Sequence, residues 1–200
     1  ELILPTLRML ENVQSVMKAS FLFCTATQPA FEKRPGFDGI ENIYPLIDDP
    51  SELYEKTRRV DYRLLNDLNP VDYMGLLEVV TQADAATLVI CNTKKAALEF
   101  YNCTKEPGIW EERYHLSTSM CPSHRKGVIK NIRYALEAKK KIVVVSTQLI
   151  EAGVDFDFPV VFRAMAPLEA VIQSAGRCNR EGNLGKLGGK VFLFKLSDGG

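Results

Sequence analysis

Residues 141–147, KIVVVST, decide the fold, because they give the clearest strand signal in the chain. One isoleucine and three valines stand side by side, and β-branched residues of this kind are enriched in strands. The run is apolar at every position instead of every second one, which is typical of a strand covered on both faces. Such strands occur in parallel sheets with helices on each side, so this stretch predicts an α/β fold.

The segments on either side of this stretch alternate between strand and helix patterns. Further strands are predicted at 21–24, 86–91, 160–164 and 190–196, with a weaker strand pattern at 113–117 and a strand with exposed charges at 58–65. Helices are predicted at 3–19, 51–57, 69–82, 92–102, 121–141 and 167–177. In the helix at 69–82 we expect Asn69 as the N-cap and Pro70 as the first helical residue. The alternation predicts a three-layer domain with a mostly parallel central sheet flanked by helices.

Composition narrows the class of protein. Of the 200 residues 46% are hydrophobic, which suffices for a sizeable core, and 25 basic residues balance 25 acidic ones. A neutral chain has no general polyanion-binding surface, so a nucleic-acid site has to be a local patch. No apolar run approaches the roughly 20 residues that span a bilayer, and no signal-peptide pattern opens the chain. We therefore expect a cytoplasmic protein without a membrane partner, and the initial Glu1 indicates a fragment or a processed piece.

The cysteines and histidines argue against a metal site. The chain has five cysteines, an odd number, and none of them forms a C-x-x-C pair. With only two histidines besides, a zinc site is not expected. This pattern is typical of free, reduced thiols in an intracellular protein, so no disulfide and no metal ligand is predicted.

Three segments resemble the motifs of a known enzyme class. The stretches FCTATQP (23–29), VVVSTQLIEAGVDFDFP (143–159) and QSAGRCNREG (173–182) resemble motifs III, V and VI of superfamily 2 helicases, in the same order and at matching spacing. Within that superfamily they are most similar to the helicase portion of the CRISPR-associated helicase–nuclease of type I systems. The resemblance covers nearly all of the chain and implies a RecA-like fold, related to that of P-loop NTPases.

Other motifs of this family are missing from the sequence. There is no G-x-x-x-x-G-K-[ST] phosphate loop, no Asp-Glu-x-His box and no His-Asp nuclease motif. The resemblance therefore implies that residues 1–45 are a remnant of the first RecA-like domain, with its last helix, strand and motif III, followed by a linker. Residues 46–200 would be the second RecA-like domain. Without the sheet of the parent domain, Phe21, Leu22 and Phe23 are expected to be exposed.

The two arginines of motif VI are the strongest candidates for catalysis. By resemblance, Arg177 and Arg180 reach the γ-phosphate of ATP, with Arg180 as the arginine finger. Gln173 would face the nucleotide cleft, and Gly176 would let the backbone come close. Helical spacing predicts that both arginines lie on one face of a helix. The alternative is a pair of solvated surface arginines with ordinary ion pairs.

The remaining candidates follow predicted strands, where α/β folds carry their ligand sites. By resemblance, Gly153 and Asp155 of motif V contact the nucleotide, with Asp155 binding the ribose or orienting Arg180; a turn cap is the alternative for Asp155. The residues expected to contact DNA phosphates are Thr25, Thr27, Asn92, Thr93 and Thr147. Capping is the alternative interpretation for Thr27 and for Thr93. Ser117, His124 and Arg125 match the motif IVa region, although a solvent-exposed His124 is the simpler interpretation.

The sequence thus predicts the C-terminal half of an ATP-dependent single-stranded-DNA translocase or helicase that acts in type I CRISPR interference. ATP with Mg²⁺ is the expected cofactor, and the magnesium ligands would come from the first RecA-like domain. Expected partners are single-stranded DNA, that domain, the nuclease domain and the RNA-guided surveillance complex. Alone, the chain is expected to be inactive. A different superfamily 2 motor, such as a restriction translocase or an RNA helicase, and a non-catalytic docking module are the alternatives.

Overall fold

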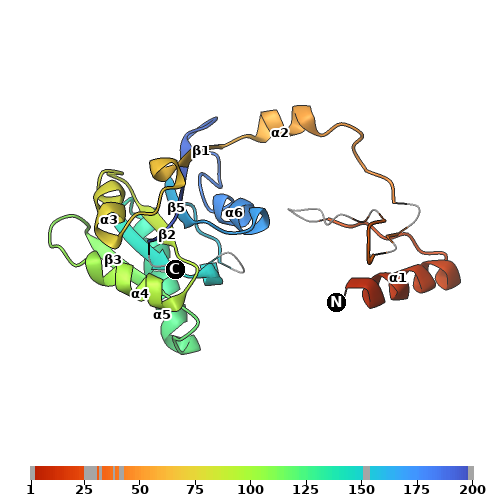
Figure 1. Cartoon of the computed structure of the whole chain (residues 1–200), viewed down its shortest axis with the longest axis horizontal. Coiled ribbons are helices and arrows are strands. Elements are labelled where there is room, and N and C mark those ends of the chain that lie inside the picture. Colours follow the sequence, from red (N-terminus) through yellow and green to blue (C-terminus); the bar gives the residue numbers. More distant parts are fainter. Residues whose placement is uncertain are drawn as a thin grey trace. The chain divides into compact units, whose positions relative to one another are not determined.

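The computed structural model describes residues 3–24, 31, 33–37, 39–40, 43–150 and 154–197. The chain divides into two compact units, Glu1–Leu53 and Tyr54–Gly200. The second unit contains the predicted sheet (Figure 1). The predictions for Thr25, Thr27 and Gly153 lie outside the described residues.

The described part of the second unit contains a six-stranded sheet in which every pairing is parallel, in the order β1-β6-β5-β2-β4-β3. The strands are β1 Val60–Leu64, β2 Thr87–Ile90, β3 Glu112–Leu116, β4 Ile142–Ser146, β5 Val160–Ala164 and β6 Gly189–Phe194. The stretch at 141–147 thus becomes β4, which lies inside the sheet between β2 and β3. The predicted parallel α/β fold is confirmed.

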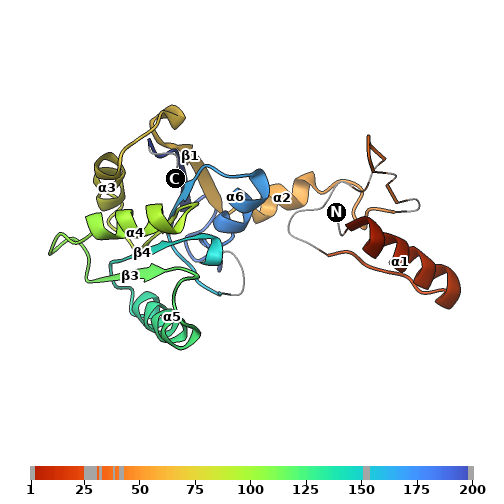
Figure 2. The same cartoon turned by 60° about the horizontal axis from the view of Figure 1, so that its bottom comes forward.

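Helices cover both faces of this sheet and make the domain three-layered. In the second unit they are α3 Tyr73–Thr81, α4 Lys94–Cys103, α5 Pro122–Glu137 and α6 Leu168–Ala175, joined by the 3-10 turns η1 Leu65–Leu68 and η2 Gln148–Ile150. Residues of α3 and α4 pack in one core cluster, and residues of α5 and α6 pack in the other. Figure 2 shows α4 and α5 on opposite sides of β3 and β4.

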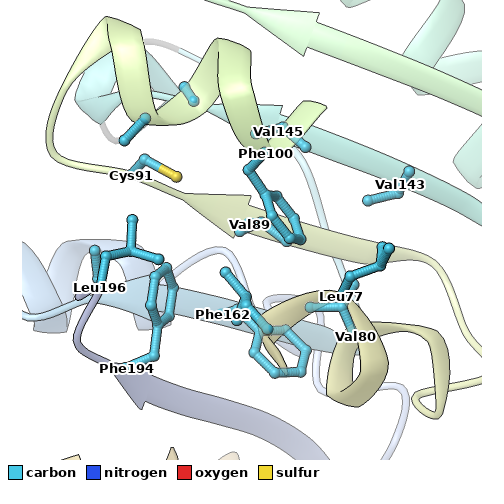
Figure 3. Packing of buried hydrophobic residues seen from close by; sticks show 14 of the residues in the cluster. Leu77, Val80, Val89, Cys91, Phe100, Val143, Val145, Phe162, Phe194 and Leu196 are labelled. Atoms are coloured by element: carbon cyan, nitrogen blue, oxygen red, sulfur yellow. The ribbon is translucent and has the colours of Figure 1, made fainter. Parts of the chain in front are cut away.

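Alternate residues of β4 explain why the whole strand is apolar. Val143 and Val145 point into the cluster with α3 and α4, where Phe100 and Phe162 also pack (Figure 3). Val144 belongs to the cluster on the other face. Since successive side chains of a strand point to opposite faces, a strand covered on both sides has to be apolar throughout.

The helix predicted at 69–82 begins later than expected. Asp72 is the N-cap of α3, and its carboxylate accepts a hydrogen bond of 2.7 Å from the backbone N–H of Gly75. Asn69 belongs to the preceding turn, where its side chain donates to the carbonyl of Asn66. The prediction of Asn69 as N-cap is therefore wrong. Asn69 and Asp72 are both residue types that cap helices, and they lie three positions apart. Asp72, which follows Pro70, is the one whose side chain accepts a helix N–H group.

The first unit contains α1 Ile3–Met17, but residues 21–24 do not form the predicted strand. A strand needs a neighbour to pair its backbone groups, and the described residues of this unit offer none to the segment. Phe21, Leu22 and Phe23 are 41%, 73% and 45% exposed, as expected for a segment without its sheet. The α2 helix, Ser51–Thr57, lies at the boundary of the two units.

Candidate functional site

Helix α6 ends before the two arginines of the motif VI segment. It runs to Ala175, with Gly176 as its C-cap, so Arg177 and Arg180 both follow it on irregular backbone. The prediction that they share one helical face is therefore wrong. The segment from 176 to 185 is called the arginine loop below.

A competing backbone pairing ends the helix. Cys178 forms a parallel bridge with Phe158, in the extended segment that leads into β5. The N–H of Phe158 donates to the carbonyl of Arg177 at 2.9 Å, and the N–H of Asn179 donates to the carbonyl of Phe158 at 3.0 Å. These groups cannot also extend a helix, because each would need an intrahelical partner instead. The bridge places the motif V segment directly beside the arginine loop.

The Asp155 carboxylate forms ion pairs with both Arg177 and Arg180. Its Oδ1 atom is 2.8 Å from Nη2 of Arg180 and 3.7 Å from Nη1 of Arg177. The Arg180 side chain is 40% exposed, whereas that of Arg177 is only 11% exposed. Arg177 also donates from Nε to the carbonyl of Ile150 at 3.2 Å, which anchors it to the turn after β4. Of the two guanidinium groups, that of Arg180 is the more accessible to a ligand.

Asp157 also belongs to this site, although it is not among the residues predicted from the sequence. Its carboxylate accepts two successive backbone N–H groups of the arginine loop, from Arg180 at 2.7 Å and from Glu181 at 3.2 Å. The sequence carries a signal for it in the alternation VDFDF. Phe156 and Phe158 are buried, so the two aspartates of this extended segment lie on its other side.

Asn179 is a buried residue that fixes the arginine loop through hydrogen bonds. It is also not among the residues predicted from the sequence. It is 1% exposed, and its φ of 46° lies in the left-handed region that Asn tolerates better than most residues. Its side-chain amide donates to the carbonyls of Arg59 and Gly185, both at 2.9 Å, and accepts from the N–H of Leu184 at 3.0 Å. The Arg59 guanidinium in turn donates to the carbonyl of Arg180.

The other predicted nucleotide residues lie close by in the chain. Gln173 is exposed on α6, one turn before Arg177. A Cβ atom at Gly176 would approach the carbonyl oxygen of Gln173 to 3.2 Å, so a side chain there would be tight. An open cavity of about 630 Å³ adjoins the arginine loop. It is lined by residues 54, 57–60 and 62, by 172 and 175 of α6, and by 176 and 178–181 of the loop.

Asn92 links the carboxyl ends of two strands. Its Oδ1 accepts from Nη1 of Arg163 at 2.7 Å, and its Nδ2 donates to the carbonyl of Met165 at 2.9 Å. Arg163 is wholly buried in β5, where Nη1 also donates to the carbonyl of Ala164 at 2.8 Å. The Asn92 side chain is thus engaged within the protein.

Thr93 and Thr147 lie at the same edge of the sheet. Thr93 is the N-cap of α4, and its hydroxyl accepts from the N–H of Ala96 at 3.1 Å. Thr147 follows β4 and is 7% exposed, and its N–H donates to the carbonyl of Leu116 at 3.3 Å, the last residue of β3. Because all strands are parallel, their carboxyl ends bring Asn92, Thr93 and Thr147 to one edge. His124 lies exposed in the first turn of α5.

The thiols in the second unit's core are shielded. All five cysteines are free. Burial raises the pKa of Cys91 to about 12, against the opposing effect of the Arg163 cation. Burial also raises the pKa of Cys178 to about 12, and the negative charge of Asp157 adds to this shift. Neither thiol is ionised near neutral pH, so neither is a candidate nucleophile.

Two further site classes find no support in the described residues. No cluster of three or more His, Cys, Asp or Glu side chains there could hold a metal ion. None of the helices in the described ranges combines the length and apolarity that a bilayer span requires.

The six-stranded parallel sheet with helices on both faces is a RecA-like α/β fold. The chain is similar to the crystal structure of T. fusca Cas3 with ADP, with a TM-score of 0.59 and 20% identity over 70% of this chain and 19% of that one. It is also similar to the C-terminal domain of the DEAD-box protein Dbp5, with a TM-score of 0.51 and 16% identity over 70% of this chain and 79% of the other. These likenesses show the fold.

Sequence comparison then gives the family. The model of the family described as CRISPR-associated nuclease/helicase Cas3, C-terminal, matches residues 83–183, half of the chain. The chain therefore belongs to this family, and the resemblance stated above is confirmed. The CRISPR-associated nuclease/helicase Cas3 of Haloferax volcanii is 52% identical over 56 residues, which are 28% of this chain and 6% of that protein. A putative Cas3 of Methanocaldococcus jannaschii is 30% identical over 115 residues, 54% of this chain and 15% of that protein.

Proposed function

We propose that this chain is the C-terminal motor part of an ATP-dependent single-stranded-DNA helicase that acts in type I CRISPR interference. One observation carries the proposal, namely that Arg177, Asp155 and the partly exposed guanidinium of Arg180 gather beyond the end of α6. Family membership supports the helicase assignment. Since the chain spans only 6% and 15% of the two relatives above, the activity belongs to a larger protein.

Arg180 would act on ATP as an arginine finger. During hydrolysis negative charge spreads over the γ-phosphoryl oxygens, and a guanidinium placed there stabilises it. In the structure Asp155 holds this guanidinium, and a phosphate would compete for it. Arg177, which is hydrogen-bonded to the carbonyl of Ile150, would hold Asp155 in place beside Arg180. Gln173, Gly153 and Gly176 would line the nucleotide site. Crystal structures of T. fusca Cas3 with ADP, AMPPNP and ATP are among the solved structures of similar fold.

The phosphate loop and the magnesium ligands would come from the upstream part of the whole protein. The sequence has no G-x-x-x-x-G-K-[ST] motif, so it cannot cradle the β- and γ-phosphates in the usual way. A nucleotide site shared by two RecA-like domains requires residues 1–45 to continue from the first of them. The two domains would close and open with each ATP, which would move DNA.

DNA would cross the carboxyl edge of the sheet. Thr93 and Thr147 lie there, and we propose that they contact phosphates together with Thr25 and Thr27. Because the Asn92 side chain is engaged with Arg163 and Met165, its contribution to DNA binding would be to orient the loop before α4. A handful of phosphate contacts gives sequence-independent binding that weakens with salt.

The proposed partners follow from the family. The nuclease domain and the first RecA-like domain would belong to the same protein, and the RNA-guided surveillance complex would deliver the DNA. A solved structure of a CRISPR RNA-guided surveillance complex before nicking contains a chain of similar fold, with a TM-score of 0.54. We place the whole protein in the cytoplasm, where its DNA target lies.

The test is DNA-stimulated ATP hydrolysis by this chain joined to its upstream half. The Arg180→Ala variant should lose about 10³-fold in kcat, the lower end of what an arginine finger contributes, while ATP still binds. Arg133→Ala, an exposed arginine on α5, is the matched control and should leave kcat unchanged. Full hydrolysis by Arg180→Ala would mean that the chain is a docking module or that another residue stabilises the phosphate.

A further inference from the structure

We propose that Asp157 is a positioning residue that sets the direction of Arg180 through the backbone of the arginine loop. The proposal rests on the function of Arg180 proposed above. Asp157 contacts no reacting atom; it acts through the residue that does. The family motif that the sequence resembles pointed to Asp155, so this role comes from the geometry alone.

The Asp157 carboxylate holds the loop at two points. Oδ1 accepts the N–H of Arg180 at 2.7 Å, and Oδ2 accepts the N–H of Glu181 at 3.2 Å. These two N–H groups flank the Cα atom of Arg180, so the contact fixes the backbone from which that side chain projects. Hydrogen bonds to an ionised acceptor are shorter and stronger than those between neutral groups.

The register of the extended segment places Asp157 there. Phe156 and Phe158 are 2% and 0% exposed, and their rings pack edge to face at 5.9 Å. The bridge from Phe158 to Cys178 pairs this segment with the arginine loop. Asp157 stands between the two buried rings in the chain, so its side chain points away from the core and toward the loop.

The two aspartates of this segment have different tasks. Asp155 binds the Arg180 guanidinium, the group that a phosphate would need, so the ion pair must yield when nucleotide binds. Asp157 binds backbone N–H groups, which a nucleotide at the guanidinium does not displace. Its contacts can therefore persist through the whole cycle and keep the Arg180 backbone in place.

Asn179 anchors the same loop on the other side of Arg180. Its buried amide group makes three hydrogen bonds to the carbonyls of Arg59 and Gly185 and to the N–H of Leu184. Asn179 is fixed immediately before Arg180 in the chain, and Asp157 accepts the N–H of Arg180 itself. The loop therefore has little conformational freedom at Arg180. Groups that are fixed before the reaction stabilise developing charge without a cost of reorganisation.

The experiment uses the chain joined to its upstream half and measures kcat, KM for ATP and the Kd of single-stranded DNA. Asp157→Ala should lower kcat by about 10²-fold, the loss that a displacement of about 1 Å produces, with KM and Kd changed less than about twofold. Asp157→Asn keeps one acceptor oxygen and should lose less. Glu137→Ala, which removes an exposed carboxylate at the end of α5, is the matched control.

A double-mutant cycle separates positioning from a merely structural role. If Asp157 acts through Arg180, Asp157→Ala should cause no further loss in the Arg180→Ala variant, because there is no guanidinium left to direct. Additive losses, or a loss confined to KM, would overturn the proposal. Should Asp157→Ala fail to fold, Asp157→Asn enters the cycle in its place. An Arg180→Ala variant with full kcat would instead overturn the proposed function.

Discussion

At the scale of the residue, the wholly buried Arg163 shows how the sheet accommodates a cation in its core. Burial of an arginine is costly unless its N–H groups find acceptors. Nη1 donates to Oδ1 of Asn92 and to the carbonyl of Ala164, and Asn92 also binds the carbonyl of Met165. The Nη1 group of Arg163 thus finds two acceptors at the carboxyl edge of β2 and β5. Asn92, expected to contact DNA, is therefore also a stabilising residue.

We predict that Asn92→Ala lowers the free energy of unfolding by about 2 kcal/mol, the usual range for a hydrogen bond to a charged group. Thr93→Ala, which removes only the N-cap of α4, should cost about 1 kcal/mol. Urea unfolding of the two variants measures both values. Equal losses, or a stable Asn92→Ala variant, would show that other acceptors carry the Arg163 charge.

At the scale of the element, β3 differs from the inner strands. It lies at the edge of the sheet, and only Leu116 of its five residues is fully buried. His115 on this strand packs against the ring of Tyr101 at a centroid distance of 5.5 Å, and within the described residues its Nε2 atom is buried without a hydrogen-bond partner. Burial lowers the pKa of His115 below its ordinary value of 6.5.

This shift predicts a pH dependence of stability. The unfolded state binds a proton to His115 at a higher pH than the folded state does, so stability is full above 6.5 and decreases as the pH falls below that value. Thermal unfolding between pH 7.5 and 5.5 should show this decrease, and His115→Gln should reduce it. The His124→Gln variant, in which an exposed histidine of α5 is replaced, is the matched control. An unchanged slope in His115→Gln would contradict the prediction.

At the scale of the whole molecule, the two units differ in how they bury apolar surface. The second unit has two continuous cores, one on each face of the sheet. The first unit leaves Phe21, Leu22 and Phe23 substantially exposed. Contiguous exposed apolar residues favour association between chains. A RecA-like sheet from the upstream domain would cover them if residues 1–45 are its remnant.

Deletion of residues 1–45 should therefore increase solubility and leave the thermal unfolding of the second unit unchanged. Sedimentation of aggregates and scanning calorimetry of the two chains measure this. The full chain with Phe21, Leu22 and Phe23 replaced by serine should gain solubility as well, since it loses the same surface. A shortened chain that aggregates more than the parent would refute the prediction.

Much of the fold was predictable, and the errors have common physical causes. The strands at 141–147 and 160–164 were located within a residue of β4 and β5, because a run of buried β-branched residues is a local signal. The prediction of a strand at 21–24 was wrong, because an apolar run forms a strand only beside a second strand that pairs with its backbone. The prediction that Arg177 and Arg180 share a helical face was wrong, because the bridge between Cys178 and Phe158 ends α6 before both arginines. Asp157 and Asn179 were missed, because their partners are backbone groups.

The sequence by itself determined the layers of this protein, the family and the segments that carry Arg177, Arg180 and Asp155. These depend on periodicity and on residue types at fixed spacing, which are properties of short stretches. Only the tertiary structure decided how the arginines are held. The motif V segment and the arginine loop lie about twenty residues apart in the chain, and β5 and α6 separate them. Their hydrogen bonds exist only once those elements have packed, and they prevail over the local tendency of the helix to continue.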